Sequence, residues 1–246
     1  MSTKNIIIIT ALVLVVGLLV VGCGGNQLST GTVEAPRVIQ TYGEAELTAP
    51  PELAKISLAV ETRSTVAEQA VEENARLATS VKEALLAFGL AEEDLVTGSY
   101  RLYSYREWME GRPLGQEEQQ TFQVVNEIIV STNDLEAVGE IIDIAVRAGA
   151  NSINYITFEI ENPQELLMQA LKAATEQAAK KAESIAEGAG ARISGLHSVR
   201  EERTDYLPFR FQSDMLKEEM AMGDGSTPIT PDEVTVRAMV VAEYAF

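Results

Sequence analysis

The chain has 246 residues, enough for one large domain or two small ones, and its formal net charge is −18 at pH 7. A chain this acidic repels nucleic-acid phosphates, and no run of Lys or Arg offers a basic face, so we expect no nucleic-acid partner. Its 46% hydrophobic and 23% charged residues are typical of a folded globular protein. One Cys and one His exclude a disulfide framework and a zinc cluster built from these residue types.

The N-terminal segment has the pattern of a secretory signal. Lys4 precedes an apolar run from Ile6 to Val21, and small residues follow it. A permanent membrane helix needs roughly 20 apolar residues, so this run is short for one. An uncleaved membrane helix with an incidental cysteine is the alternative interpretation.

The residues Val20-Val21-Gly22-Cys23 resemble a bacterial lipobox. The resemblance implies that diacylglycerol is attached to Cys23, that residues 1–22 are removed, and that further acylation (palmitate, for example) completes the anchor. Two or more acyl chains hold a protein stably on a membrane. Residues 23–36 are mostly small and polar and are predicted to be a flexible spacer. We therefore expect an extracytoplasmic lipoprotein, anchored in the cell membrane or the outer membrane.

The first half of the exported part alternates strands and helices. Alternating apolar residues predict strands over 38–49, 53–62, 97–105 and 121–131, and Pro50-Pro51 ends the first of them. Helices are predicted after two capping boxes, Thr65 with Glu68 and Asn133 with Glu136. Gly89 and Gly149 are predicted to end these helices.

The second half begins with a predicted strand over 152–161 and a long helix from Pro163 to about Glu187. Every fourth residue of this helix is alanine from Ala170 to Ala186, which indicates either close packing on a sheet or association of helices between subunits. A weaker strand over 192–200 precedes an irregular arm, 201–231, and a last strand over 234–246.

The resulting order, β-β-α-β-β-α-β-α-β-β, predicts an α+β domain over 37–246 with antiparallel sheets covered by helices. The two β-β-α units at its start, Val38–Phe88 and Tyr100–Ala148, suggest a structural duplication.

The sequence contains no recognisable catalytic signature. His197 has no second His or carboxylate pattern beside it, and no nucleophile elbow places a Ser with a His and an Asp. Adjacent acids such as Glu92-Glu93-Asp94 indicate a solvated surface, and the spacing of an EF-hand is missing. We therefore expect a non-enzymatic protein without catalytic residues, bound metal or cofactor.

Two groups of residues are candidate contact surfaces. Alternating aromatic residues offer a platform for a sugar or peptide, although cross-strand packing also explains them: Tyr100, Tyr103, Tyr105 and Trp108. A pocket bordered by these rings would favour the ligand hypothesis, and burial in the core would count against it. Residues of the arm form a candidate oligomer contact: Tyr206, Phe209, Phe211, Met215, Met220 and Met222.

Several motifs, spread over most of the mature chain, together resemble the SIMPL-domain family of bacterial envelope proteins. They are Gly43-Glu44-Ala45-Glu46, Pro50-Pro51-Glu52-Leu53-Ala54, Val96-Thr97-Gly98-Ser99-Tyr100, Val125-Asn126, Gly149-Ala150-Asn151, Gly188-Ala189-Gly190 and Pro228-Ile229-Thr230-Pro231. The resemblance implies an α+β fold without established catalysis, ring- or channel-like homo-oligomers in some members, and a link to oxidative-stress tolerance in others.

The leading hypothesis is a lipid-anchored, non-enzymatic envelope protein that forms homo-oligomers through the 201–231 arm and the Ala-rich helix. The alternative is an extracytoplasmic binding module for a small ligand or cell-wall fragment.

Overall fold

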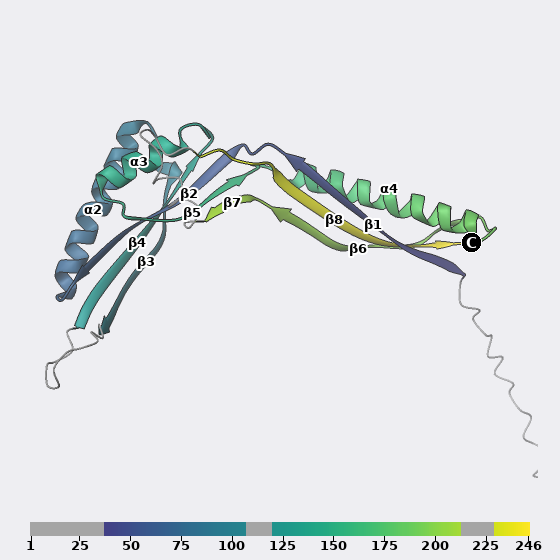
Figure 1. Ribbon diagram of the computed structural model, residues 1–246, viewed down its shortest axis with the longest axis horizontal. Coiled ribbons are helices and arrows are strands. Elements are labelled where there is room, and N and C mark those ends of the chain that lie inside the picture. The colour runs from purple at the N-terminus through teal and green to yellow at the C-terminus, as the bar shows by residue number, and fades with distance from the viewer. Residues whose placement is uncertain (1–36, 107–119, 213–228) are drawn as a thin grey trace, which may run out of the picture. The chain divides into compact units, whose positions relative to one another are not determined.

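The computed structural model describes residues 37–106, 120–212 and 229–246. The chain divides into two units, Met1–Arg37 and Val38–Phe246, and the described helices and strands all belong to the second. In chain order these elements are β1 (Val38–Ala49), β2 (Leu53–Ser64), α2 (Ala67–Phe88), a short 3-10 helix (Glu92–Asp94), β3 (Leu95–Arg106), β4 (Gln120–Thr132), α3 (Val138–Ala148), β5 (Ser152–Glu159), α4 (Gln164–Gly188), β6 (Gly195–Leu207), β7 (Phe209–Gln212) and β8 (Val234–Ala245). The strands form antiparallel sheets covered by helices, which confirms the predicted α+β class (Figure 1).

The smaller sheet has three strands in the order β1-β8-β6, and α4 lies along it (Figure 1). Alternate residues of β8, from Val234 to Tyr244, are buried beneath the helix. The alanine row of α4, from Ala170 to Ala186, is at most 1% exposed and contacts these same strands. The row therefore packs on the sheet of its own chain, and this face of the helix does not serve contacts between subunits.

Small residues bring α4 unusually close to β1. A Cβ atom added at Gly43 would lie 1.8 Å from the backbone oxygen of Ala174 and 2.7 Å from the backbone nitrogen of Ala178. Beside it, the Thr41 hydroxyl donates a 2.9 Å hydrogen bond to the carbonyl oxygen of Ala178. The contact thus depends on a missing side chain in the strand and on alanines in the helix.

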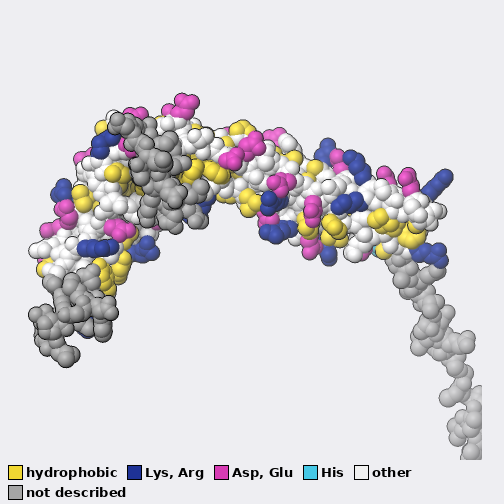
Figure 2. All heavy atoms as spheres, in the orientation of Figure 1, with side chains coloured by type: hydrophobic (Ala, Val, Ile, Leu, Met, Phe, Trp, Pro, Cys, Tyr) yellow, Lys and Arg dark blue, Asp and Glu magenta, His cyan; other side chains and the backbone are white. Residues whose placement is uncertain are grey.

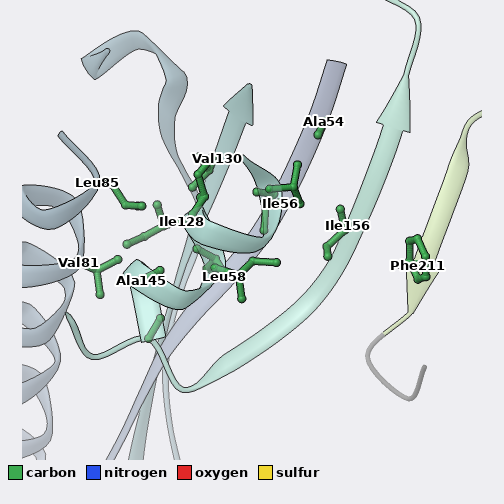
Figure 3. Packing of buried hydrophobic residues seen from close by; sticks show 14 of the residues in the cluster. Ala54, Ile56, Leu58, Val81, Leu85, Ile128, Val130, Ala145, Ile156 and Phe211 are labelled. Atoms are coloured by element: carbon green, nitrogen blue, oxygen red, sulfur yellow. The ribbon is translucent and has the colours of Figure 1, made fainter. Parts of the chain in front are cut away.

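The larger sheet has five strands in the order β3-β4-β2-β5-β7, and α2 and α3 cover one face. Ile56, Leu58 and Val60 of the central strand β2 are fully buried under these helices. Figure 3 shows Ile56 and Leu58 within this core. Burial of each such side chain contributes roughly 1.5–3 kcal/mol to folding. The remaining strands add the other inward-facing residues of the same core, including Ile128, Val130, Ile156, Phe158 and Phe211.

The expected duplication of a β-β-α unit is wrong. β1 pairs along its whole length with β8 in the smaller sheet, whereas β2 pairs with β4 and β5 in the larger one. The following pair, β3 and β4, are neighbours within one sheet. Pro50-Pro51 explains part of the difference, because two residues without backbone N–H groups interrupt the ladder where the chain passes between sheets.

Both predicted capping boxes are also wrong. α2 begins at Ala67, and Val66 at its N-cap makes no side-chain cap bond; its backbone N–H donates instead to the Ser64 hydroxyl. α3 begins only at Val138. The amide of Asn133 donates instead to the Glu52 carbonyl and the Glu161 carboxylate. The predicted ends Gly89 and Gly149 are confirmed, with φ of 120° and 128°.

The arm predicted to be irregular over 201–231 is largely regular where the structure describes it. β6 continues to Leu207, and β7 pairs with β5, which places Phe209 opposite Phe158. Phe209 and Phe211 are two residues apart, which is the spacing expected on the buried face of a strand.

The close approach of α4 to β1 gives a direct test. Changing Gly43 to Ala should lower the free energy of unfolding by about 1–3 kcal/mol, because the new methyl group meets helix backbone that cannot rotate away. Gly195→Ala in β6 is the matched control, since a Cβ there meets no atom within 4 Å. Urea unfolding of both variants measures the difference, and equal stabilities would contradict the proposed contact.

Candidate functional site

The larger sheet has a second face, opposite α2 and α3, that we call the open face. The strand register places alternate residues there in rows that cross three strands: Glu61, Val125 and Arg101 in one row, and Arg63, Gln123 and Tyr103 in the next. Gln123 and Val125 are 5% and 7% exposed, whereas Arg63, Arg101 and Tyr103 are exposed. The open face is therefore mostly polar at its surface.

A hydrogen-bond network centred on Glu127 joins four strands on the open face. One carboxylate oxygen accepts from the Ser57 hydroxyl at 2.5 Å and from the Asn154 amide at 3.4 Å. The other accepts from the Ser99 hydroxyl at 2.9 Å. Asn154 lies at an irregularity in the β2–β5 register, opposite Ser57 and Leu58, and also donates to the Ser57 hydroxyl. The network thus links β2, β3, β4 and β5.

The environment of Glu127 favours its ionised form. The hydrogen bond from Ser57 lowers the pKa of this carboxyl, and those from Ser99 and Asn154 and the charge of Arg101 act in the same direction against the effect of burial. A carboxylate with a lowered pKa is a weaker base than an ordinary Glu, so it is poorly suited to activate Ser57 or Ser99 as a nucleophile. The arrangement is suited to holding the strands together.

The predicted aromatic platform lies on β3, an outer strand of the larger sheet. Tyr100 and Tyr103 are 51% and 46% exposed, so they are not part of the core, while Tyr105 is half-buried with its ring centroid 6.4 Å from that of Tyr103. Tyr100 and Tyr103 are on opposite faces of the strand. Trp108 lies outside the described residues. The structure therefore brings Tyr103 and Tyr105 together on one face of β3 and places Tyr100 on the other.

Three cavities of about 500 Å³ are lined by other residues. One lies between α2 and the start of β3, beside Ala78, Leu95 and Ile128. A second borders Gln177 of α4 and the exposed Tyr42. The third lies on the smaller sheet, where Arg237 pairs with Glu46 at 2.8 Å and Arg203 pairs with Asp205 at 2.5 Å. Figure 2 shows Lys or Arg side chains interspersed with Asp or Glu side chains on the visible surface of the smaller sheet and α4.

The outer strands of the two sheets differ in how far their unpaired backbone is covered. On β1, the amide oxygen of Gln177 accepts from the Glu44 backbone N–H at 2.9 Å, and the Lys181 ammonium donates to the Tyr42 carbonyl at 2.9 Å. The outer strand β7 has only four residues. In contrast, β3 and β6 have 12 and 13 residues, most of them exposed. We call these the β3 edge and the β6 edge.

The described residues of the predicted oligomer contact pack within the chain itself. Phe211 is 7% exposed and meets Phe158 edge to face, and Phe209 lies 5.1 Å from Phe211 between ring centroids. The Tyr206 hydroxyl accepts a 2.8 Å hydrogen bond from the Ile160 backbone N–H. Met215, Met220 and Met222 lie outside the described residues. The aromatic half of the predicted contact is thus occupied by the fold.

Two asparagines satisfy backbone groups of β2, a role that the sequence analysis missed. Asn151 accepts from the Glu61 N–H at 2.8 Å and donates to the Glu61 carbonyl at 2.8 Å, so its side chain continues the ladder where β5 begins. Asn74 of α2 is fully buried and donates to the Val60 carbonyl at 2.8 Å. The available signal for Asn74 was its spacing from Ala70 and Val81, which places it on the buried face of the helix.

The described part of the chain offers no group of three or more His, Cys, Asp and Glu residues that could hold a metal ion. Within the same residues, no helix is both long enough and apolar enough to cross a membrane. His197 is exposed on β6. Cys23, the predicted lipidation site, lies outside the described residues.

A family model described as "SIMPL: Protein of unknown function (DUF541)" matches residues 39–244. The chain therefore belongs to the SIMPL family, as its motifs predicted. The match spans both sheets and all three described α-helices.

Named relatives agree with this assignment. The chain is 26% identical over 210 residues to the "26 kDa periplasmic immunogenic protein" of Brucella melitensis biotype 1, covering 85% of this chain and 82% of the relative. It is 22% identical over 200 residues to "Uncharacterized protein YggE" of Escherichia coli K12, covering 81% and 78%. A protein of the same name from Edwardsiella ictaluri is 24% identical over 189 residues, covering 76% and 78%.

The Glu127 network predicts a pH-dependent contribution to stability. Because the folded-state pKa lies below the ordinary value of about 4.5, the contribution is complete above that value and is lost as the pH falls through the folded pKa. Glu127→Gln should lower the free energy of unfolding by on the order of 1–2 kcal/mol at pH 7. The difference from the unmodified protein should shrink below pH 4.5.

Urea unfolding between pH 7 and pH 3 measures this dependence. Glu72→Gln, at an exposed position of α2, is the control and should change stability little at any pH. A Glu127→Gln deficit that stays constant down to pH 3 would show that the carboxylate charge does not stabilise the sheet.

Proposed function

We propose that this SIMPL protein is a lipid-anchored, non-enzymatic protein of the bacterial cell envelope that associates with further copies of itself. The name of the Brucella relative places that protein in the periplasm and supports an extracytoplasmic location here. The secretory pattern of residues 1–22 and the lipobox-like residues ending in Cys23 support an anchor on the outer side of a membrane.

The observation that carries self-association is that, within the described residues, neither β3 nor β6 has a strand on its outer side. An outer strand exposes a row of unpaired N–H and C=O groups, which is a template for pairing with another chain. The β3 edge also exposes apolar side chains, with Val96 at 54% and Leu102 at 48%. On the β6 edge, Leu196 is 56% and Val199 is 48% exposed. These two edges, the second of which includes residues 201–207 of the predicted arm, are the proposed contact.

The proposal assigns no catalytic residue. Glu127, the carboxylate most extensively hydrogen-bonded by side chains on the open face, is stabilised as an anion and joins strands. We also propose that the protein has a role in envelope or oxidative stress, and the family resemblance is the support for that role.

A binding module for a small ligand or cell-wall fragment is the second candidate. The exposure of Tyr100 and Tyr103 favours it, because both rings are available to a ligand. It ranks second because these rings lie on opposite faces of β3, and the three cavities described above are lined by other residues.

The lipid anchor is tested by mass spectrometry of protein isolated from membranes. The chain should begin at an acylated Cys23, and Cys23→Ala should abolish incorporation of an alkyne analogue of palmitate and leave Met1 in place. An unmodified protein that retains Met1 and a free thiol would contradict the anchor.

Self-association is tested by sedimentation equilibrium of the mature protein in density-matched detergent. The particle should contain more than one chain, and its mass should stay the same when the detergent concentration is raised, because protein contacts rather than shared micelles hold it together. A single-chain mass at every protein concentration would contradict self-association.

A further inference from the structure

We infer that one end of the smaller sheet rests on the membrane that holds the lipid anchor, with its exposed apolar side chains between the lipid headgroups and the acyl chains. We call this end the tip. It consists of the start of β1, the end of β8, and the segment from Ile185 to Leu196 that joins α4 to β6. The inference rests on the proposed lipid anchor and goes beyond it, because it gives the folded domain a membrane contact of its own.

Strand register and helix packing bring these segments of the chain to one end. Val38, at the start of β1, is paired with Ala245 at the end of β8, which is paired in turn with Gly195 at the start of β6. Ala186, near the end of α4, packs in the same buried cluster as Tyr244. Figure 1 shows the C-terminal end of β8 beside the end of α4.

The spacer predicted over residues 23–36 joins the proposed anchor to this same end, because β1 begins at Val38. A flexible chain of that length has a root-mean-square span of about 20 Å and extends to at most about 50 Å. The tip is therefore the part of the folded domain that the anchor holds nearest to the membrane. Tethering by a short linker gives it a high effective concentration at the surface, so a weak contact is sufficient.

Three large apolar side chains are exposed at the tip and come from three different segments. Phe246 follows β8 and is 44% exposed, Ile185 of α4 is 49% exposed, and Leu196 of β6 is 56% exposed. Side chains of this kind are stabilised at the boundary between headgroups and acyl chains. Leu196 is in the first row of β6, so a contact through the ends of the strands leaves the rest of the β6 edge for another copy.

Charge selects the tip as the end that can approach an anionic lipid surface. The whole chain has a net charge of −18 and is repelled by such a surface. In contrast, the segment from Gly188 to Val199 has no acidic residue, and its Arg192 is exposed and able to bind lipid phosphates. Among the nearest acids, Glu187 precedes this segment, and Glu243 accepts hydrogen bonds from two side chains of the sheet.

Contact at the tip would also set the direction of the domain on the membrane. β1 starts at the tip and ends at Ala49, and the chain then enters the larger sheet through β2. The larger sheet is thus the part held away from the lipid surface. Its β3 edge and its open face are then accessible to partners in the space outside the membrane.

The test uses the full mature, lipid-anchored protein in vesicles of phosphatidylethanolamine and phosphatidylglycerol. Because the chain has a single cysteine and the anchor alkylates it, one introduced cysteine can be labelled alone with a fluorophore. Ala189→Cys places the label at the exposed end of α4. Val66→Cys, at the 46% exposed N-cap of α2, is the control. Circular dichroism verifies that the labelled proteins remain folded.

Quenching of the fluorophore by lipids that carry a nitroxide near the headgroup gives the readout. The label at Ala189→Cys should be quenched several-fold more than the label at Val66→Cys. Adding Phe246→Glu and Ile185→Glu to the first protein should lower its quenching to the control level. Adding Met168→Glu and Val146→Glu, at positions that are 53% and 44% exposed elsewhere in the fold, should leave it unchanged.

Flotation with the vesicles separates this inference from the proposed function. If the protein floats but both labels are quenched equally, or if the two glutamates at the tip change nothing, the tip does not dock and the anchor still stands. If the fluorescence at Ala189→Cys changes without quenching by the nitroxide, another copy covers the tip and the inference is wrong. If the protein does not float, the anchor and the inference both fail.

Discussion

The pairing of backbone hydrogen-bond groups is the constraint on which this structure depends. Each antiparallel sheet must end in two outer strands, and the outward N–H and C=O groups of those strands need water, a side chain or another strand. The chain satisfies part of the β1 edge with Gln177 and Lys181 and keeps β7 to four residues. Among the described residues no strand lies on the outer side of β3 or β6, and the functional account follows from that difference.

Covering β1 requires α4 to lie close to it, and the residues at the contact make this possible. Gly43 leaves room for the helix backbone, the alanine row removes bulk from the helix, and Thr41 bonds to the Ala178 carbonyl. The same face would also suit contacts between helices of different subunits. The fold uses this face internally, so it is not available to a partner.

Local sequence patterns predicted most of the elements but not their partners. The alternation of β8 and the alanine period of α4 identified both elements and their buried faces, because these signals depend only on residues nearby in the chain. The pairing of β1 with β8 joins residues about 200 positions apart, and no local period reports such a contact. The capping boxes failed because α2 begins at Ala67, with the Val66 N–H donating to Ser64, and because the Asn133 amide donates to Glu52 and Glu161.

The candidate site was predictable only in part. The tyrosines of β3 were identified, but their exposure depends on β3 being an outer strand, which is a property of the whole sheet. The aromatic residues of the arm were identified as a contact, and they are one, but with the chain's own core. The Glu127 network escaped detection because Ser57, Ser99 and Asn154 come from three different strands.

The central claim is that the β3 and β6 edges are covered by other copies of the chain. Hydrogen–deuterium exchange of the unmodified protein, measured at a high concentration and after dilution below the association range, tests it most directly. The account predicts that peptides covering residues 95–106 and 195–207 exchange slowly when concentrated and faster after dilution, while β2 is unchanged. Equal exchange of these peptides in both states, despite a change in particle mass, would contradict it.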